Sequence, residues 1–194
     1  MTTKPRILIV GAGIGGLAAA LALGKRGFPV NVYEQAPELM ELGAGVQISA
    51  NGSRVLIALG LKDAMQRVVC EAALKEVRIW NTGQTWKLFD LGKDSIERFG
   101  APYWFVHRGD MHRALLDGVR GCANVAVHTG KRCTGFAQDG SKVTLTFTGG
   151  ETATGDALIG ADGVHSTVRH QLFEAGKPEF MGIICWRGLI KDEE

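Results

Sequence analysis

The N-terminal segment of the chain, residues 6–34, has the sequence RILIVGAGIGGLAAALALGKRGFPVNVYE. Ile7 to Val10 form a continuous apolar run, which is typical of a strand buried on both faces of a parallel sheet. Gly11, Gly13 and Gly16 follow with the spacing G-x-G-x-x-G. In such turns the first glycine permits the tight turn, the second lets the backbone approach a diphosphate, and the third lets helix pack on strand.

The residues after this turn complete a βαβ unit. The Ala- and Leu-rich stretch from Gly13 to Arg26 contains no proline and predicts a helix whose positive N-terminus faces the phosphates. Val30, Val32 and Tyr33 predict a second strand, and Glu34 follows Gly11 by 23 residues. An acid near this spacing binds a ribose hydroxyl, which favours FAD or NAD over NADP. This segment alone does not separate FAD from NAD.

Composition indicates a globular protein of one domain or slightly more. The chain has 194 residues, of which 45% are hydrophobic, and a formal net charge of +2. This charge gives no indication of binding to nucleic acid or to a membrane surface. No segment approaches the roughly 18 apolar residues of a spanning helix, and the start has no signal peptide pattern. The four cysteines and five histidines lack metal-site spacing. We therefore expect a cytoplasmic protein without a metal.

Beyond Glu34, the pattern predicts a long loop and then helices and a hairpin. Asn51 is the expected N-cap of a helix that ends at Gly60, and a second helix is expected over 62–69. Alternating residues predict a hairpin of strands 74–80 and 85–90. A strand over 103–107 and a helix capped by Asp110 follow.

The C-terminal half predicts a β-meander of strands 124–128, 132–138 and 142–148, followed by a strand, an Asp162-Gly163 turn and a helix. A last strand is expected over 182–190. That strand and the hairpin have no other obvious sheet to join, so we interpret them as parts of an incomplete second domain. The predicted boundaries are residues 1–72 and 104–178 for the first domain, and 73–103 and 179–194 for the second.

Several of these motifs together resemble the single-component, FAD-dependent aromatic hydroxylases, the group of salicylate, hydroxybenzoate, hydroxynicotinate and urate hydroxylases. They are the glycine turn with Glu34, LGAGVQISANGSRVLIALGL (42–61), HRGDMHRALL (107–116), LIGADGVHSTVR (158–169) and WRGLI (186–190). The resemblance covers nearly the whole chain. It implies an α/β fold in which a Rossmann-like FAD-binding domain with a β-meander is interrupted by strands of a substrate domain.

The resemblance also implies site residues. Gly11, Gly13 and Gly16 would form the diphosphate turn, with Glu34 on the ribose and Gln35 alongside. The residues expected near the ribityl chain and flavin are Gly45 and Val46, in a loop, and Arg108. The backbone at Cys133 would meet the adenine, and Asp162 and Gly163 match a motif associated with FAD and the nicotinamide donor. Trp186 and Arg187 match a strand near the substrate, although packing in the second-domain sheet is the favoured interpretation.

The reaction implied by the resemblance is hydroxylation of a small aromatic compound with O2 and with electrons from NADH or NADPH, through FAD. No residue of the chain is assigned a catalytic role. The family's second FAD motif, an Asp in a GD segment, does not occur here, so we expect an N-terminal portion that is inactive alone. Two alternatives stay open: another FAD- or NAD-binding oxidoreductase, and a non-catalytic nucleotide-binding fragment completed by another chain. Homo-oligomer formation is also left open.

Overall fold

The computed structural model describes residues 4–39, 44–174 and 176–184, and the chain divides into two compact units. Unit 1 comprises residues 1–41 and 115–188, and unit 2 comprises residues 42–114 and 189–194. These units are groups of residues in mutual contact. The assignment of the chain to an FAD-binding and a substrate domain therefore stays a prediction.

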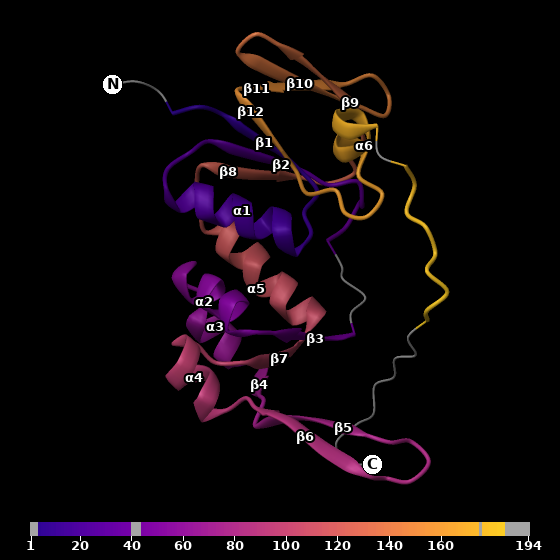
Figure 1. Ribbon diagram of the computed structural model, residues 1–194. Helices are drawn as coiled ribbons and strands as arrows, with labels where there is room; N and C mark the ends of the chain where they lie inside the picture. Colours follow the sequence, from indigo (N-terminus) through magenta and orange to yellow (C-terminus); the bar gives the residue numbers. More distant parts are fainter. Residues whose placement is uncertain (1–3, 40–43, 175, 185–194) are drawn as a thin grey trace. The chain divides into compact units, whose positions relative to one another are not determined.

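Unit 1 is built on a four-stranded parallel sheet (Figure 1). Its strands are β1 (Ile7–Val10), β2 (Val30–Tyr33), β8 (Val125–His128) and β12 (Ala157–Gly160), in the order β12-β1-β2-β8. All four residues of β1 are buried, as expected for a central strand covered on both faces. The predicted parallel α/β arrangement is thus confirmed.

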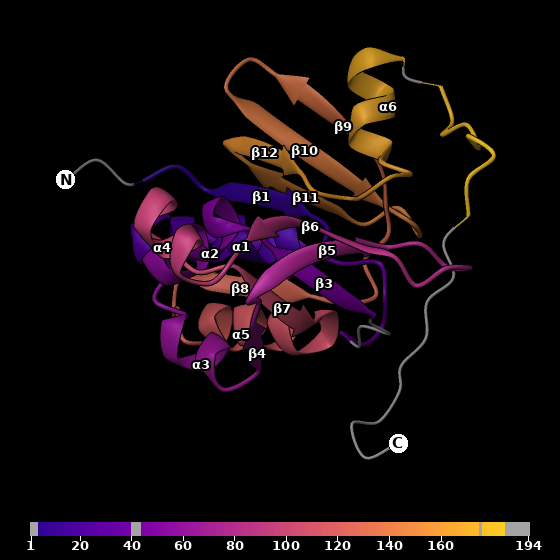
Figure 2. The ribbon, with the colours of Figure 1, turned by 60° about the horizontal axis from the view of Figure 1, so that its bottom comes forward.

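The two faces of this sheet are covered by different structures. Helix α1 (Ile14–Lys25) lies on one face, and an antiparallel meander of β9 (Cys133–Asp139), β10 (Lys142–Phe147) and β11 (Thr152–Gly155) lies on the other (Figures 1 and 2). Leu8 and Val10 of β1 pack in one core cluster with Leu145 and Phe147 of the meander. Helix α6 (Thr167–Phe173) lies beside β9, and its Val168 joins the same cluster.

The structure contains the predicted antiparallel meander, but one of the three strands assigned to it belongs to the parallel sheet. Residues 125–128 pair in parallel with β2, from Val30↔Val125 to Tyr33↔His128, so they extend the parallel sheet. The third meander strand is instead β11, which pairs antiparallel with β10. A four-residue run such as VAVH suits either sheet, and only its pairing partner decides where it belongs.

An exposed ion pair ties the meander to the start of β1. The Asp156 carboxylate accepts from Lys142 Nζ at 2.5 Å and from the Arg6 backbone N–H at 2.6 Å. The Lys142 hydrogen bond, followed by that of Arg6, lowers the pKa of Asp156 below its ordinary value of 3.8. A carboxyl with a lowered folded-state pKa stabilises the fold above its unfolded pKa, and this contribution is lost as the pH falls through the folded one.

We therefore expect Asp156→Asn to lower the melting temperature slightly at neutral pH, because an ion pair at the surface, open to solvent on the Lys142 side, contributes little. The difference from the parent should disappear as the pH falls below the lowered pKa of Asp156. Thermal melts from about pH 7 to about pH 1 measure this difference. Lys142→Gln should cause a similar loss that does not add to that of Asp156→Asn. A pH-independent difference would contradict the assignment.

Unit 2 contains a three-stranded antiparallel sheet and short helices. The sheet has the order β3-β7-β4, from strands β3 (Gly45–Ile48), β4 (Val69–Glu71) and β7 (Trp104–His107). Its helices are α2 (Ala50–Ala58), α3 (Lys62–Gln66) and α4 (Lys93–Phe99). Helix α5 (Arg108–Arg120) begins in unit 2 and ends in unit 1.

Several helix boundaries differ from the prediction. The N-cap of α2 is Ser49, whose hydroxyl donates to the Asn51 side chain, so the expected cap at Asn51 is wrong. Helix α3 ends at Gln66 because residues 69–71 turn into a strand. Helix α5 starts at Arg108 directly after β7, which places Asp110 in its first turn and not at its cap. Helix α4 was not predicted, since seven residues are too few for a clear helical period.

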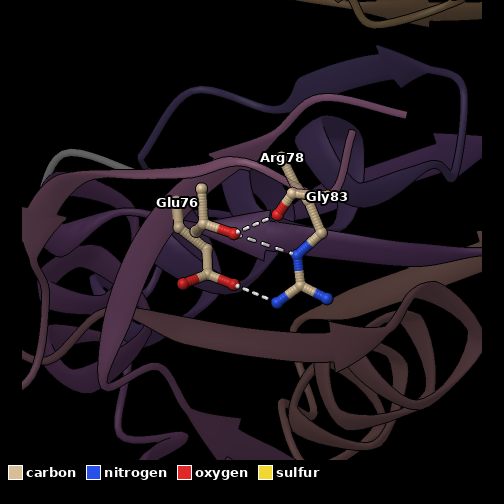
Figure 3. Close-up of polar contacts among 4 residues, drawn as sticks. Glu76, Arg78 and Gly83 are labelled. Carbon is tan, nitrogen blue, oxygen red and sulfur yellow. Dashed lines mark hydrogen bonds and ion pairs between the residues drawn. The ribbon is translucent and has the colours of Figure 1, made fainter. Parts of the chain in front are cut away.

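The predicted hairpin is confirmed as β5 (Leu74–Arg78) paired with β6 (Thr85–Asp90). Arg78 contacts Glu76 at 3.2 Å and Thr85 Oγ1 at 3.2 Å, and Thr85 donates to the Gly83 carbonyl near the turn (Figure 3). All residues of both strands are exposed.

The last predicted strand is only partly within the described residues. Residues 182–184 form no strand, and residues 185–190, including Trp186 and Arg187, lie outside them. In the part of the chain that the structure covers, no helix has the length and apolar character needed to cross a membrane.

Candidate functional site

A cavity of about 270 Å³ lies in unit 1, at the carboxyl ends of β1, β2 and β12. This edge of an open parallel sheet is where such folds bind ligands. The predicted site residues that line it are Gly11, Gly13, Glu34, Gln35, Cys133, Asp162 and Gly163. The structure thus brings together residues from three distant parts of the sequence.

The three glycines of the turn have different physical roles. Gly11 has a φ of +100°, and a Cβ there would lie 2.3 Å from the Ala161 carbonyl oxygen. A Cβ on Gly16 would lie 1.9 Å from the Gly11 oxygen, so Gly16 serves the packing of α1 on the turn and does not line the cavity. A Cβ on Gly13 would meet no atom within 4 Å. Only Gly13 therefore leaves space that the protein itself does not use.

The N-terminus of α1 begins at this open position. Gly13 is its N-cap and has no side chain with which to cap the first N–H groups, and the first turn contains no acidic residue. These N–H groups and the positive end of the helix dipole are consequently available to an anion at the cavity. Such an arrangement suits a phosphate group.

Glu34 is held at the end of β2 by hydrogen bonds from the backbone. Its Oε2 accepts from the Ala12 N–H at 2.8 Å, and its Oε1 accepts from the Ala36 N–H at 2.9 Å. A carboxylate oxygen has a second lone pair, so both bonds can persist while Glu34 also accepts from a hydroxyl. The carboxylate is therefore fixed in place before any ligand binds.

The segment that leads into the meander also lines the cavity, next to Glu34. Of this segment, the sequence analysis identified only Cys133. Lys131 and Arg132 line the cavity as well. The Lys131 backbone N–H donates to the Glu34 carbonyl at 2.8 Å, and the Gly130 N–H donates to Ala36 at 2.9 Å. No local sequence signal indicates this approach, because it depends on pairing between segments far apart in the chain.

Cys133 itself is a buried residue of the core. Burial raises the pKa of its thiol, and the Sγ donates to the Gly135 carbonyl at 3.5 Å. The thiol is therefore protonated at neutral pH and unsuited to nucleophilic chemistry. This agrees with a role for the backbone at Cys133 and not for its side chain.

Tyr33, which the sequence analysis placed only in a strand, also lines the cavity, and it belongs to the core cluster of the sheet and the meander. Its ring stacks on His128 with a centroid distance of 4.9 Å and contacts Phe147 at 4.8 Å. Burial raises the pKa of Tyr33, so its hydroxyl is neutral at physiological pH.

Asp162 directs its carboxylate to the helix that follows it. Oδ1 accepts from Ser166 Oγ at 2.5 Å, and Oδ2 accepts from the Val168 N–H at 3.2 Å. Ser166 caps α6 by accepting from the Arg169 N–H at 2.9 Å. Gly163 follows with a φ of +77°. The Asp162 side chain thus braces the turn, and the backbone of the Asp162-Gly163 turn borders the cavity.

Three further predicted residues belong to unit 2. Gly45 and Val46, expected in a loop, are the first residues of β3, because they pair with His107 and Val106 of β7. The Arg108 N–H donates to the Ala44 carbonyl at 3.2 Å, which places Arg108 next to Gly45. The structure therefore groups these three residues with one another, and their contact with the cofactor stays a prediction.

Within the described ranges, no group of three or more His, Cys, Asp or Glu side chains could hold a metal ion.

Comparison with known proteins places the chain in a family. The family described as FAD binding domain matches residues 4–190. The chain belongs to this family. A curated relative, 3-amino-4-hydroxybenzoate 2-monooxygenase of Streptomyces cremeus, is 40% identical over 95% of this chain and 46% of its own length. The 6-hydroxynicotinate 3-monooxygenase of Pseudomonas fluorescens is 36% identical over the whole chain and 50% of its own length.

Solved structures of related proteins have the same fold. The structure of the tetrameric form of 2-methyl-3-hydroxypyridine-5-carboxylic acid oxygenase matches 89% of this chain, with a TM-score of 0.75 and 29% sequence identity. HpxO of Klebsiella pneumoniae, complexed with FAD and uric acid, matches 86% with a TM-score of 0.71 and 34% identity. The chain covers 43% and 41% of these two proteins, so it spans less than half of their length. The resemblance to the N-terminal part of aromatic-ring monooxygenases is confirmed.

Proposed function

We propose that the chain binds FAD in the cavity of unit 1, as part of a flavoprotein that hydroxylates a small aromatic compound. The observation that carries this proposal is the open position at Gly13. It lies at the uncapped N-terminus of α1 and beside the fixed carboxylate of Glu34. A diphosphate next to a ribose requires this combination of a backbone cradle and a carboxylate acceptor.

The residues around the cavity fit the parts of FAD. The diphosphate would bind at Gly13 and the first N–H groups of α1, and Glu34 would accept from the ribose. The backbone at Cys133 would meet the adenine, and the Asp162-Gly163 turn would border the rest of the dinucleotide. When bound, FAD supplies the redox chemistry, taking electrons from a nicotinamide donor and delivering them to O2. We extend the proposal to Gly45, Val46 and Arg108 as residues near the flavin.

Support for the aromatic substrate comes from the relatives. Those named above include monooxygenases of an aminohydroxybenzoate and of a hydroxynicotinate. NADH or NADPH as donor, O2 as co-substrate and a cytoplasmic location belong to the same proposal. The tetrameric relative supports association of copies. The chain spans 46–50% of the curated relatives named above, so the complete reaction is proposed for a protein that contains all the parts found in them.

The test is FAD binding by two glycine variants of the same helix end. Gly13→Ala places a methyl group where we propose the diphosphate, and we expect FAD affinity to fall about tenfold with a loss of less than about 1 kcal/mol in stability. Gly15→Ala is the matched control, because a Cβ there also meets no atom within 4 Å but Gly15 does not line the cavity.

Titration of the apoprotein, followed by quenching of flavin fluorescence, gives both affinities. Equal FAD affinity in the parent and Gly13→Ala would overturn the proposed site. Tighter binding of NAD than of FAD by the parent would overturn the choice of cofactor.

A further inference from the structure

The unit 1 cavity is bordered by a cation to which the proposed function gives no role. Lys131 and Arg132 both line this cavity. Lys131 Nζ forms an ion pair with Glu151. Arg132 is exposed, and the described residues provide its side chain with neither a hydrogen-bond acceptor nor an ion-pair partner. Its guanidinium therefore has five N–H donors and two planar faces available to a ligand.

The carboxylates that line the cavity are bound by other groups. Glu34 accepts from two backbone N–H groups, and Asp162 accepts from Ser166 Oγ and from a backbone N–H of α6. In the part of the chain that the structure describes, neither carboxylate pairs with Arg132. The charge of Arg132 is therefore not neutralised by the cavity itself.

The backbone on both sides of Arg132 is fixed by hydrogen bonds. The Lys131 N–H donates to the Glu34 carbonyl at 2.8 Å, and the Arg132 carbonyl accepts from the Thr148 N–H at 2.9 Å. Cys133, the next residue, begins β9 and is buried in the core. Because successive side chains of an extended segment point to opposite sides, the Arg132 side chain points away from that core, at the border of the cavity.

The order of the strands predicts which part of a dinucleotide reaches Arg132. Gly13 follows β1, Glu34 follows β2 and Arg132 follows β8, and these strands are neighbours in the order β1-β2-β8. Adjacent strands lie about 4.8 Å apart, so the three positions succeed one another along the carboxyl edge of the sheet. A diphosphate at Gly13 and a ribose at Glu34 therefore direct the attached base toward residues 131–133.

We propose that Arg132 is a cofactor-binding residue whose guanidinium stacks on the face of the adenine of FAD. A planar guanidinium stacks on aromatic faces, and a cation above such a ring is attracted by its π electrons. The backbone at Cys133 would meet the edge of the same ring. The inference rests on the proposed function, and it adds a side chain to an adenine contact that the backbone would otherwise make alone.

The experiment is a calorimetric titration of the chain with ADP, which has the diphosphate, ribose and adenine of FAD but no flavin. Arg132→Ala removes the stacking group, and we expect the affinity for ADP to fall about fivefold. The affinity for FAD should fall by the same factor. Arg120→Ala is the matched control, because Arg120 is also exposed, pairs with Asp117 and does not line the cavity. This control should bind ADP as the parent does.

Two further variants distinguish stacking on the base from attraction to the phosphates. Arg132→Tyr keeps a flat group without the charge, and bases stack favourably on aromatic rings, so its affinity for ADP should stay within about twofold of the parent. Arg132→Lys keeps the charge without the plane and should bind ADP less tightly than Arg132→Tyr. In the parent saturated with ADP, nuclear Overhauser contacts should join adenine H2 or H8 to the side-chain protons of Arg132.

Parental affinity for ADP in Arg132→Ala would overturn the proposal. Full affinity in Arg132→Lys together with a loss in Arg132→Tyr would also overturn it, as would the absence of Overhauser contacts between adenine and Arg132 at saturation. The Gly13→Ala variant separates this inference from the proposed function. If Gly13→Ala weakens ADP binding and Arg132→Ala does not, the FAD site stands and the role of Arg132 falls. If the parent binds neither ADP nor FAD, the proposed function falls as well.

Discussion

Gly16→Ala is expected to lower the free energy of unfolding by about 3 kcal/mol or more, because its new methyl group collides with backbone. The Cβ would lie 1.9 Å from the Gly11 oxygen and 3.0 Å from the Gly11 carbon. A flexible side chain could move aside, but these atoms belong to the turn between β1 and α1. Any relief must therefore shift the helix away from the sheet and distort the cavity at the same time.

Thermal and urea unfolding followed by circular dichroism measure this loss. Gly15→Ala is the control, because the same methyl group one residue earlier meets open space. Alanine is also the better helix former, so this control should be as stable as the parent or more stable by up to about 1 kcal/mol. A Gly16→Ala chain with the unfolding midpoint of Gly15→Ala would contradict the close packing at Gly16.

Glu34→Ala is expected to weaken FAD binding by about 10- to 100-fold. This is the effect of losing a hydrogen bond between a charged group and the ribose, about 1.5–3 kcal/mol. The same change removes the acceptor of the Ala12 and Ala36 N–H groups. The folded chain should therefore also lose about 1–3 kcal/mol of stability even without ligand.

Two further variants separate the contributions of Glu34. Glu34→Gln keeps one side-chain acceptor and should give an intermediate affinity, since its amide group opposes one of the two backbone donors. Glu38→Ala removes a nearby exposed carboxylate that does not line the cavity and should leave both affinity and stability unchanged. Titrations below the melting temperature of the least stable variant compare affinities alone. An Ala variant with parental FAD affinity would show that Glu34 does not contact the ribose.

Local sequence was sufficient for the segment that forms the phosphate turn. The strand, glycine turn, helix and second strand over residues 7–33 occur where predicted, because each depends on neighbours within a few positions. Helix starts were less predictable. The stretch SANGS offers several cap-forming residues, and the choice of Ser49 over Asn51 follows from where the preceding strand β3 ends.

The sheet that each strand joins was not readable from its own residues. The strand over 125–128 completes the parallel sheet because it pairs with β2, although its sequence also suits the meander. Because β8 pairs with β2, the residues that follow β8 lie next to Glu34, and Lys131 and Arg132 therefore line the cavity. The sequence did not predict either residue as part of the site, because their position depends on this pairing between distant segments.

By itself, the sequence determined the family, the glycine turn and the carboxylate at the end of the second strand. These features depend on residue types at short, regular spacing, where backbone sterics and the helix dipole act locally. The tertiary structure alone decided that the start of the meander and the Asp162-Gly163 turn close the same cavity. It also decided that Asp162 braces a helix and that Gly13, of the three glycines, faces open space. Those outcomes depend on contacts between distant segments, which only the packing of the sheet brings together.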